Sequence, residues 1–223
     1  GTGGLLAERE LDARRRAFKA DAPAQAAYLN TLSVERPLGG LTVSLFAYEN
    51  PGLAGLLAAW AGGEQPVLCL VPEGRVLPEV LDYFGVATGA VGQRFQAGAL
   101  SVQILPFVAQ PDYDRLLWAC DLNFVRGEDS FVRAQWAGRP LVWQIYAQEA
   151  AAHLDKLDAF LRHYREALSP ATATALQTFW QAWNTGGDAG TAWPALRRAL
   201  PELAVHAESW VGHLNSLGSL ASN

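Results

Sequence analysis

The sequence predicts an α/β domain built on a parallel sheet and followed by a helical C-terminal segment. Apolar runs that suit strands alternate with helical patterns up to residue 145, and only helical periodicity follows Tyr146. The runs are apolar on both faces, as expected for strands that helices cover on both sides. The expected strands are residues 41–48, 66–71, 100–107, 119–125 and 141–145, with helices at 53–60, 76–84, 112–118 and 129–136 between them.

Helices are also expected before and after this alternating region. Residues 5–28 are rich in Ala, Glu, Arg and Leu, which favour helix, and the turn at 37–40 (PLGG) ends this segment. From Ala150 to Leu168, apolar residues recur at alternating spacings of four and three, which places them on one helix face. Further helices are expected at about 171–183, 193–200 and 203–214.

The composition fits one large domain, or a domain with a helical appendage. The chain has 223 residues, 50% of them hydrophobic, and a net charge of −5. The basic run at 14–16 reads as a solvated helix face rather than a nucleic-acid patch. No apolar stretch is long enough to suggest a membrane span, and the first residues lack the pattern of a signal peptide.

Cysteine and methionine usage adds two expectations. Cys69 and Cys120 each sit in an apolar run, so buried free thiols on neighbouring core strands are expected rather than a disulfide. This favours a reducing, cytoplasmic location. Because the chain contains no Met and opens on GTGG, it is either a processed protein or an excised piece of a longer one. The sequence leaves both alternatives open.

The segment FVRGEDSF carries the main functional signal. Ligands of open α/β sheets bind at the carboxyl ends of the strands, and the strand here ends near Val125. Arg126 and Gly127 form the turn, and the N-terminus of the next helix favours an anion, to which Arg126 adds charge and Ser130 a hydroxyl. Glu128, Asp129 or Ser130 is expected to cap the helix, and Asp129 is the preferred candidate. An ordinary capped helix explains the same residues, and the pattern alone favours it.

Two further loops are candidates for the same site. In PFVAQPDYD, Phe107 could stack on a base, and Gln110 offers the donor and the acceptor that a pyrimidine edge requires. In LFAYEN, Tyr48 could reach a phosphate. The alternatives are a Pro-rich turn with a buried Phe107 and a core position for Tyr48.

Other catalytic motifs are missing. No Cys or carboxylate completes a metal set with the four His residues, so no metal site is expected. The sequence contains no GxSxG, Walker or GxGxxG motif, which disfavours a dehydrogenase-like NAD domain.

The stretch DLNFVRGEDSFVRAQWAGRPLVWQIYAQEAAAHLDKLDAFL resembles the bacterial family of protein-arginine rhamnosyltransferases called EarP. The opening GTGGLL and the segments LFAYEN and PFVAQPDYD resemble this family in the same order. The resemblance implies transfer of L-rhamnose from dTDP-β-L-rhamnose to an arginine of translation elongation factor P. It also implies an inverting enzyme of the GT-B arrangement, with two facing Rossmann-like domains and the donor held in the C-terminal one.

The resemblance also implies roles for individual residues. Glu128 matches a residue needed for activity, which we interpret as organising the donor rather than acting as the base, and Arg126 helps to stabilise the leaving diphosphate. Like the family's enzymes, the site is expected to need no cofactor and no metal. The implied donor-binding residues are Phe107 and Gln110 near the thymine, Tyr48, Asp129 and Ser130 near the diphosphate and sugar, and the aromatic residues Phe46, Tyr113 and Tyr146.

The family's N-terminal domain, with its acidic general base and most of the acceptor site, has no counterpart in this sequence. We therefore expect an isolated donor-binding domain, inactive alone, that meets elongation factor P mainly through the missing domain. The expected parts are a lead-in helix and turn (1–40), a Rossmann-like donor-binding domain (41–185) and C-terminal helices packed on it (186–223). Neither nucleic acid nor membrane is an expected partner. The alternative is a non-enzymatic module that docks elongation factor P through its Trp-rich helical half.

Overall fold

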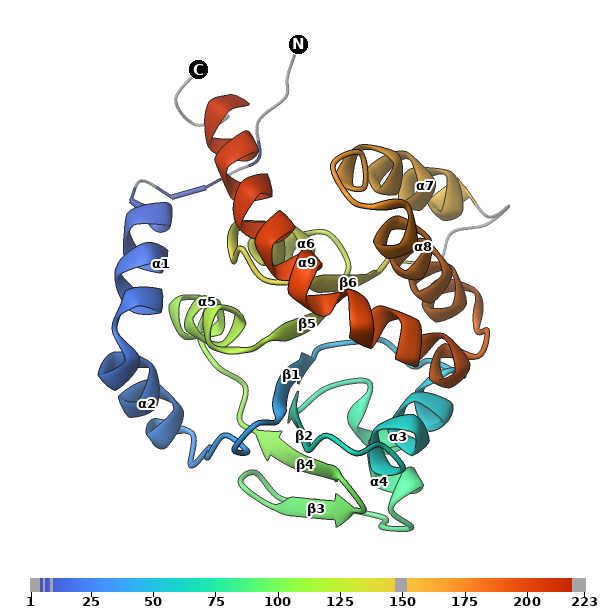
Figure 1. The fold of residues 1–223 in the computed structure, drawn as a ribbon. Coiled ribbons are helices and arrows are strands. Elements are labelled where there is room, and N and C mark those ends of the chain that lie inside the picture. The colour runs from blue at the N-terminus through green and yellow to red at the C-terminus, as the bar shows by residue number, and fades with distance from the viewer. Residues whose placement is uncertain (1–4, 6, 9, 147–151, 218–223) are drawn as a thin grey trace.

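The computed structural model describes residue 5 and residues 7–8, 10–146 and 152–217. In this part of the chain a six-stranded sheet lies between layers of helices (Figure 1). The strands are β1 (Leu41–Leu45), β2 (Val67–Pro72), β3 (Arg94–Ala97), β4 (Leu100–Leu105), β5 (Leu122–Arg126) and β6 (Leu141–Gln144). The helices are α1 (Leu11–Ala20), α2 (Ala22–Thr31), α3 (Leu53–Ala61), α4 (Leu77–Tyr83), α5 (Gln110–Ala119), α6 (Asp129–Trp136), α7 (Ala152–Tyr164), α8 (Pro170–Thr185) and α9 (Ala189–Leu217).

The sheet confirms the predicted α/β class and has a Rossmann-like strand order. The order across the sheet is β3-β4-β2-β1-β5-β6, and β1 pairs in parallel with both β2 and β5. Strands β2, β3 and β4 therefore lie on one side of the central β1. The chain then crosses to the other side of β1, where it forms β5 and β6. This reversal creates a switch point between β1 and β5, where open α/β sheets place their ligands.

One edge of the sheet was not predicted. Strand β3 pairs with β4 in the antiparallel direction, with Phe95 opposite Val102. Its residues, RFQA, are exposed or half-buried in alternation. A four-residue edge strand of this kind lacks the continuous apolar run that identified the other strands, so the prediction of a purely parallel sheet was wrong at this edge.

The inner strands are buried on both faces, as their apolar runs predicted. Trp60 of α3 packs edge-on against Phe124 of β5 and against Trp193 of α9, with ring centroids 6.0 and 5.5 Å apart. Burial of such side chains stabilises the fold by roughly 1.5–3 kcal/mol each. The opposite face of the sheet packs on α2 and α5 through a smaller cluster that includes Leu29 and Leu116.

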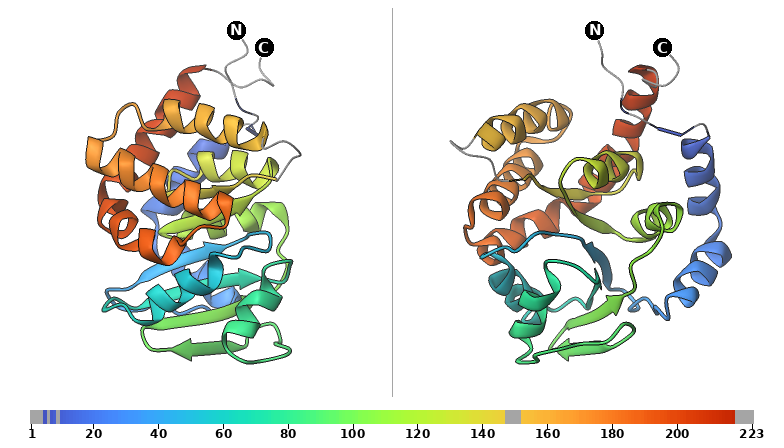
Figure 2. Two further views of the ribbon diagram at one scale, coloured as in Figure 1. Left: turned by 90° about the vertical axis from the view of Figure 1, so that its right-hand side faces the viewer. Right: turned by 180° about the vertical axis from the view of Figure 1, so that it is seen from behind.

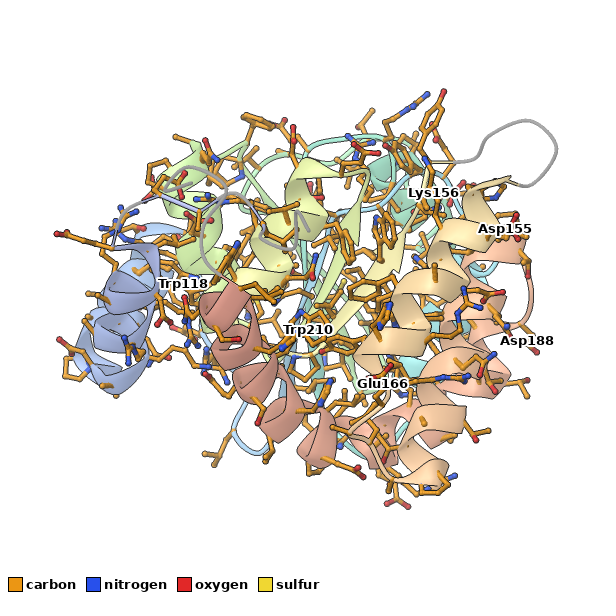
Figure 3. All side chains as sticks on the ribbon, turned by 90° about the horizontal axis from the view of Figure 1, so that it is seen from above. Trp118, Asp155, Lys156, Glu166, Asp188 and Trp210 are labelled. Atoms are coloured by element: carbon orange, nitrogen blue, oxygen red, sulfur yellow. The ribbon has the colours of Figure 1, made fainter. Side chains whose placement is uncertain are left out.

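The tryptophans of the helical half belong to the core. Trp180, Trp183 and Trp193 are all buried, and Figure 2 shows α7, α8 and α3 stacked along one side of the sheet. Trp210 points inward from α9 (Figure 3), and its Nε1 donates a hydrogen bond to Oε1 of Gln135 at 3.1 Å. These indole rings therefore pack in the core. They are not a surface for docking elongation factor P, so the alternative of a non-enzymatic docking module is not favoured.

Helix α7 has the predicted amphipathic face. Leu157, Leu161 and Tyr164 are buried, whereas Asp155 is exposed on the helix (Figure 3). Glu166, in the turn that follows α7, is also exposed. The first residue of the predicted stripe, Ala150, lies outside the described residues.

Two helix predictions need correction. The predicted helix at 5–28 is two helices, because the Asp21 side chain accepts a hydrogen bond from the Ala24 amide and starts α2 beside Pro23. The two helices predicted at 193–200 and 203–214 are one helix, α9, which bends along its length in Figure 1 and contains Pro194 and Pro201. Packing of its inner face outweighs the local preference of proline. Although α9 has 29 residues, neither it nor any other described helix is apolar enough to cross a membrane.

The two cysteines are buried free thiols, as predicted, but not on neighbouring strands. Cys69 lies in β2, and Cys120 follows α5, before β5 begins. Strand β1 separates β2 from β5. Burial raises the pKa of both thiols, so both stay protonated at neutral pH.

An ion cluster ties the first helix to the last. The carboxylate of Glu208 on α9 accepts hydrogen bonds from Arg15, at 2.7 Å, and from Lys19, both on α1. The Arg15 side chain is 3% exposed and also pairs with Asp12. Lys19 donates a further hydrogen bond to the Gly138 carbonyl at 3.0 Å. The lead-in helix is thereby fixed to the body of the domain.

Candidate functional site

A pocket of about 1500 Å³ opens at the carboxyl edge of the sheet, above the switch point. Its walls are the segments that follow β1, β2, β4, β5 and β6, together with residues that precede α1. All the residues predicted to bind or act on a donor line this one pocket. They are Phe46, Tyr48, Phe107, Gln110, Tyr113, Arg126, Glu128, Asp129, Ser130 and Tyr146.

Arg126 is held between two aromatic rings in the pocket wall. Its guanidinium carbon lies 4.5 Å from the centroid of Phe46 and 4.7 Å from that of Tyr48. Its Nη1 is buried without a hydrogen-bond partner, and no carboxylate pairs with this arginine among the described residues. Cation–π contacts partly compensate for lost water, but an unpaired N–H in a pocket wall favours an anionic ligand.

The turn that follows Arg126 is held by backbone hydrogen bonds. Gly127 has a φ of +64°, a left-handed conformation in which other residues are strained. Its carbonyl accepts a hydrogen bond from Nε1 of Trp143 at 2.6 Å, and its N–H donates to the Gln144 carbonyl at 3.1 Å. A Cβ at this position would lie 3.1 Å from the Tyr48 hydroxyl, so glycine also makes room for Tyr48.

The start of α6 differs from the prediction. Glu128, not Asp129, is the N-cap residue, and it makes no capping hydrogen bond with its side chain. Asp129 is the first helical residue, so its predicted capping role is wrong. The Ser130 hydroxyl accepts a hydrogen bond from the Arg126 amide at 3.1 Å and donates one to the Arg126 carbonyl. Its proton therefore closes the turn instead of standing free for a ligand.

Aromatic side chains form the rim of the pocket. Phe107 is 79% exposed and Tyr146 is 61% exposed, although both are large and apolar. The alternative of a buried Phe107 is therefore wrong, and the alternative of a core position for Tyr48 is also wrong, since Tyr48 is half-buried and lines the pocket. Exposed rings in a pocket offer flat faces for stacking. Gln110, the first residue of α5, is exposed beside them.

Tyr113 and Tyr146 complete the aromatic lining. Tyr113 packs edge-on against Phe46 at 5.8 Å, and Tyr146 packs edge-on against Tyr48 at the same distance. Burial raises the pKa of Tyr113, so its phenol stays protonated.

Sequence reasoning missed several charged residues of the pocket. Arg133 on α6 donates a two-pronged hydrogen bond to the buried Asp114 of α5, with Nε 2.7 Å from Oδ1. Its Nη1 also contacts Glu8 at 2.5 Å. Burial raises the pKa of Asp114, against the opposing effect of Arg133. This pair joins α5, which carries Gln110 and Tyr113, to α6, which carries Asp129 and Ser130.

Arg75 is the other missed arginine of the pocket. Arg75 lies three residues after the end of β2. Because ligands of open α/β sheets bind at the carboxyl ends of the strands, this position could have identified Arg75 from the sequence. Nothing in the described residues forms a cluster of His, Cys, Asp and Glu side chains that could hold a metal ion.

The strand order defines a Rossmann-like α/β domain, and a pocket lies at its switch point. Comparison with known families identifies it further. The chain belongs to the EarP family, since the model described as "Elongation-Factor P (EF-P) rhamnosyltransferase EarP" matches residues 1–223. The resemblance inferred from the sequence is thereby confirmed, and with it a glycosyltransferase family.

Curated relatives carry the same assignment. A protein-arginine rhamnosyltransferase of Pseudomonas aeruginosa is 54% identical over 221 residues, which are 99% of this chain and 59% of that protein. The Shewanella oneidensis protein of the same name is 38% identical over 94% of this chain and 55% of its own length. The chain thus spans little more than half the length of these relatives.

A solved structure has the same fold. It is described as "Structural basis for EarP-mediated arginine glycosylation of translation elongation factor EF-P" and superimposes with a TM-score of 0.92 at 49% identity. The match covers 98% of this chain and 70% of the solved one.

Proposed function

We propose that this chain is the donor-binding domain of an inverting GT-B glycosyltransferase that transfers rhamnose from dTDP-β-L-rhamnose to an arginine of elongation factor P. The observation that carries the proposal is the Arg126 guanidinium, clamped between Phe46 and Tyr48 with an unpartnered N–H in the pocket wall. A half-buried cation that no carboxylate pairs with among the described residues favours a phosphate group. Residues 41–185 are the binding domain in this proposal, 1–40 are its lead-in and 186–223 its C-terminal part. The described helices α1, α2 and α9 pack beside the binding domain.

The diphosphate is proposed to bind between Arg126 and the N-terminus of α6. The helix dipole and the first N–H groups of α6 favour negative charge there, and Glu128 does not cap them. As the bond to the sugar breaks, charge grows on the distal phosphate, and a fixed guanidinium stabilises that charge. The protein supplies this positive charge itself, so we propose that the domain needs no metal or other cofactor.

The thymine is proposed to stack on Phe107, whose exposed ring is available at the rim. Gln110, the first residue of α5, follows Phe107 by three residues and carries both a donor and an acceptor for the pyrimidine edge. Tyr113 and Phe46 close the inner side of this part of the pocket.

Glu128 is proposed to organise the donor rather than to remove a proton. It is exposed at the start of α6, two residues from Arg126, and no cation pairs with it among the described residues. A carboxylate beside a diphosphate avoids repulsion when it accepts hydrogen bonds from neutral hydroxyls of the ribose or the sugar. Asp129 and Tyr146 are proposed to contact the same part of the donor.

The acceptor arginine is proposed to attack the anomeric carbon from the opposite side, which inverts the β-linked donor to an α-linked product. In the longer relatives, we propose that the general base and most of the contact with elongation factor P lie outside the region matched by this chain. The chain alone then binds the donor but transfers nothing. A translation factor as the acceptor implies a cytoplasmic location.

Calorimetric titration with dTDP tests the proposal. The wild-type chain is expected to bind dTDP, and Arg126→Gln is expected to weaken binding about 100-fold, or about 2–3 kcal/mol. Arg162→Gln, which changes an exposed arginine of α7, is the matched control and should bind normally. A folded wild-type chain that ignores dTDP contradicts the proposal. Stabilisation by NAD instead, or tight binding of elongation factor P without nucleotide, would favour the other two interpretations.

A further inference from the structure

Three arginines line the pocket, and they differ in how their charges are used. Arg133 is neutralised by Asp114 and by Glu8, so its charge is not available to a ligand. Arg126 is fixed between two rings. Arg75 is 58% exposed and has a single carboxylate partner, Glu49. Of these three cations of the pocket, it is the one that is both available and free to move.

Arg75 lies next to the anion site. Its Nε is 3.3 Å from Oε1 of Glu49, and its guanidinium carbon is 5.8 Å from the ring centroid of Tyr48. Tyr48 is also one of the two rings that hold Arg126, at 4.7 Å. The two guanidinium groups are therefore connected by one tyrosine, with Arg126 in the pocket wall and Arg75 nearer the solvent.

The ion pair of Arg75 is weak enough to exchange. Both side chains are more than half exposed, and exposed pairs of this kind contribute little because water and salt screen them. A nucleotide-sugar diphosphate carries a negative charge on each phosphate, and Arg126 can neutralise one of them. A phosphate offers a guanidinium the same two-pronged contact as a carboxylate, and a phosphate held inside the pocket is screened less by water and salt than the exposed Glu49.

We propose that Arg75 is a second, movable diphosphate contact, which leaves Glu49 when the donor binds and pairs with the phosphate that Arg126 does not neutralise. It thereby makes the pocket selective for nucleoside diphosphates over monophosphates. This inference rests on the proposed function of the pocket and adds a specificity-determining residue to it.

The test is calorimetric titration of the whole chain with dTDP and with dTMP. Arg75→Gln is expected to weaken dTDP binding about fivefold to tenfold and to change dTMP binding less than about twofold. Arg75→Lys, which keeps the charge but loses the fork, should recover part of the dTDP affinity. A general loss of structure would weaken both nucleotides equally, so the ratio of the two affinities reports the specific contact.

Arg115→Gln is the matched control. Arg115 is 52% exposed and pairs with Asp112 at 3.2 Å, much as Arg75 pairs with Glu49, but it does not line the pocket. This variant should leave both affinities unchanged.

Removal of the competing carboxylate gives a prediction of the opposite sign. Glu49→Gln should strengthen dTDP binding about twofold to threefold, because Arg75 no longer has to leave a partner. In the Arg75→Gln background the same change should have a smaller effect, and this non-additivity is the mark of a direct coupling.

The outcomes separate the inference from the function on which it rests. If the folded wild-type chain does not bind dTDP, both are overturned. If it binds dTDP but Arg75→Gln keeps the wild-type ratio of dTDP to dTMP affinity, the role of Arg75 is overturned and the proposed function stands. A fall in that ratio, with Arg115→Gln unchanged, supports both.

Discussion

Gly127→Ala is expected to weaken nucleotide binding in addition to destabilising the fold. Gly127 is in the left-handed region, at a φ of +64°, and a Cβ there would lie 3.1 Å from the Tyr48 hydroxyl. That contact is tighter than ordinary van der Waals distance, so Tyr48 has to shift by a few tenths of an ångström. Tyr48 is one of the two rings that hold Arg126, so the shift reaches the proposed phosphate contact.

The effects on stability and on binding have separate causes and can be measured separately. Alanine in the left-handed region costs roughly 1–2 kcal/mol. The lower entropy of the unfolded chain returns about 0.4–1 kcal/mol of this. The net loss of unfolding free energy is therefore about 1 kcal/mol. A displaced charge-assisted contact should weaken dTDP binding by about 1 kcal/mol or more, which is at least about fivefold.

Gly85→Ala is the matched control for this prediction. Gly85 has a φ of +66°, but nothing lies within 4 Å of the position of its Cβ. Urea unfolding should show similar stability losses for both variants, whereas calorimetry should show weaker dTDP binding for Gly127→Ala alone. Equal dTDP affinities in the two variants would refute the link from Gly127 through Tyr48 to Arg126.

Three further predictions concern the framework around the site. Asp114→Asn leaves the half-buried Arg133 with a neutral partner, so urea unfolding should show a loss of about 2 kcal/mol, below the range for breaking fully buried pairs because a second carboxylate remains. Glu208→Gln removes a carboxylate from the buried Arg15 and should cost about 1–2 kcal/mol in the same assay. Burial lowers the pKa of His206 below its usual 6.5, so the folded state binds fewer protons than the unfolded chain. Stability should therefore fall as pH drops through the range below 6.5, and His206→Leu should flatten this slope in melts between about pH 7 and pH 5.

The fold was largely predictable because its inner strands are continuous apolar runs. The run that contains Cys69 and the run that leads into Arg126 each became a buried strand close to the expected limits. Strand β3 and the continuity of α9 were not predictable, since each depends on tertiary packing. The first is polar enough to read as a loop, and the second contains Pro194 and Pro201, which normally end helices.

The gathering of the predicted residues around one pocket was also predictable, but the partners of the charged residues were not. Residues that follow parallel strands gather at one edge whatever their identity, so the predicted set lines one pocket. Sequence does not show which arginine has a partner. The three arginines of the pocket are the same residue type and differ only in the contacts that the fold creates. Among the described residues, Arg126 has no carboxylate partner, Arg133 has two, and Arg75 has one, which is exposed.

The contact between Glu8 and Arg133 makes the segment before α1 part of the pocket wall, along with Leu5 and Ala7. Thermodynamic linkage then works in both directions. If displacement of this segment lowers the affinity of the pocket for a ligand, binding of the ligand must disfavour the displacement. The two equilibrium constants change by the same factor. Displacement of Leu5, Ala7 and Glu8 and occupancy of the pocket are therefore expected to be energetically coupled.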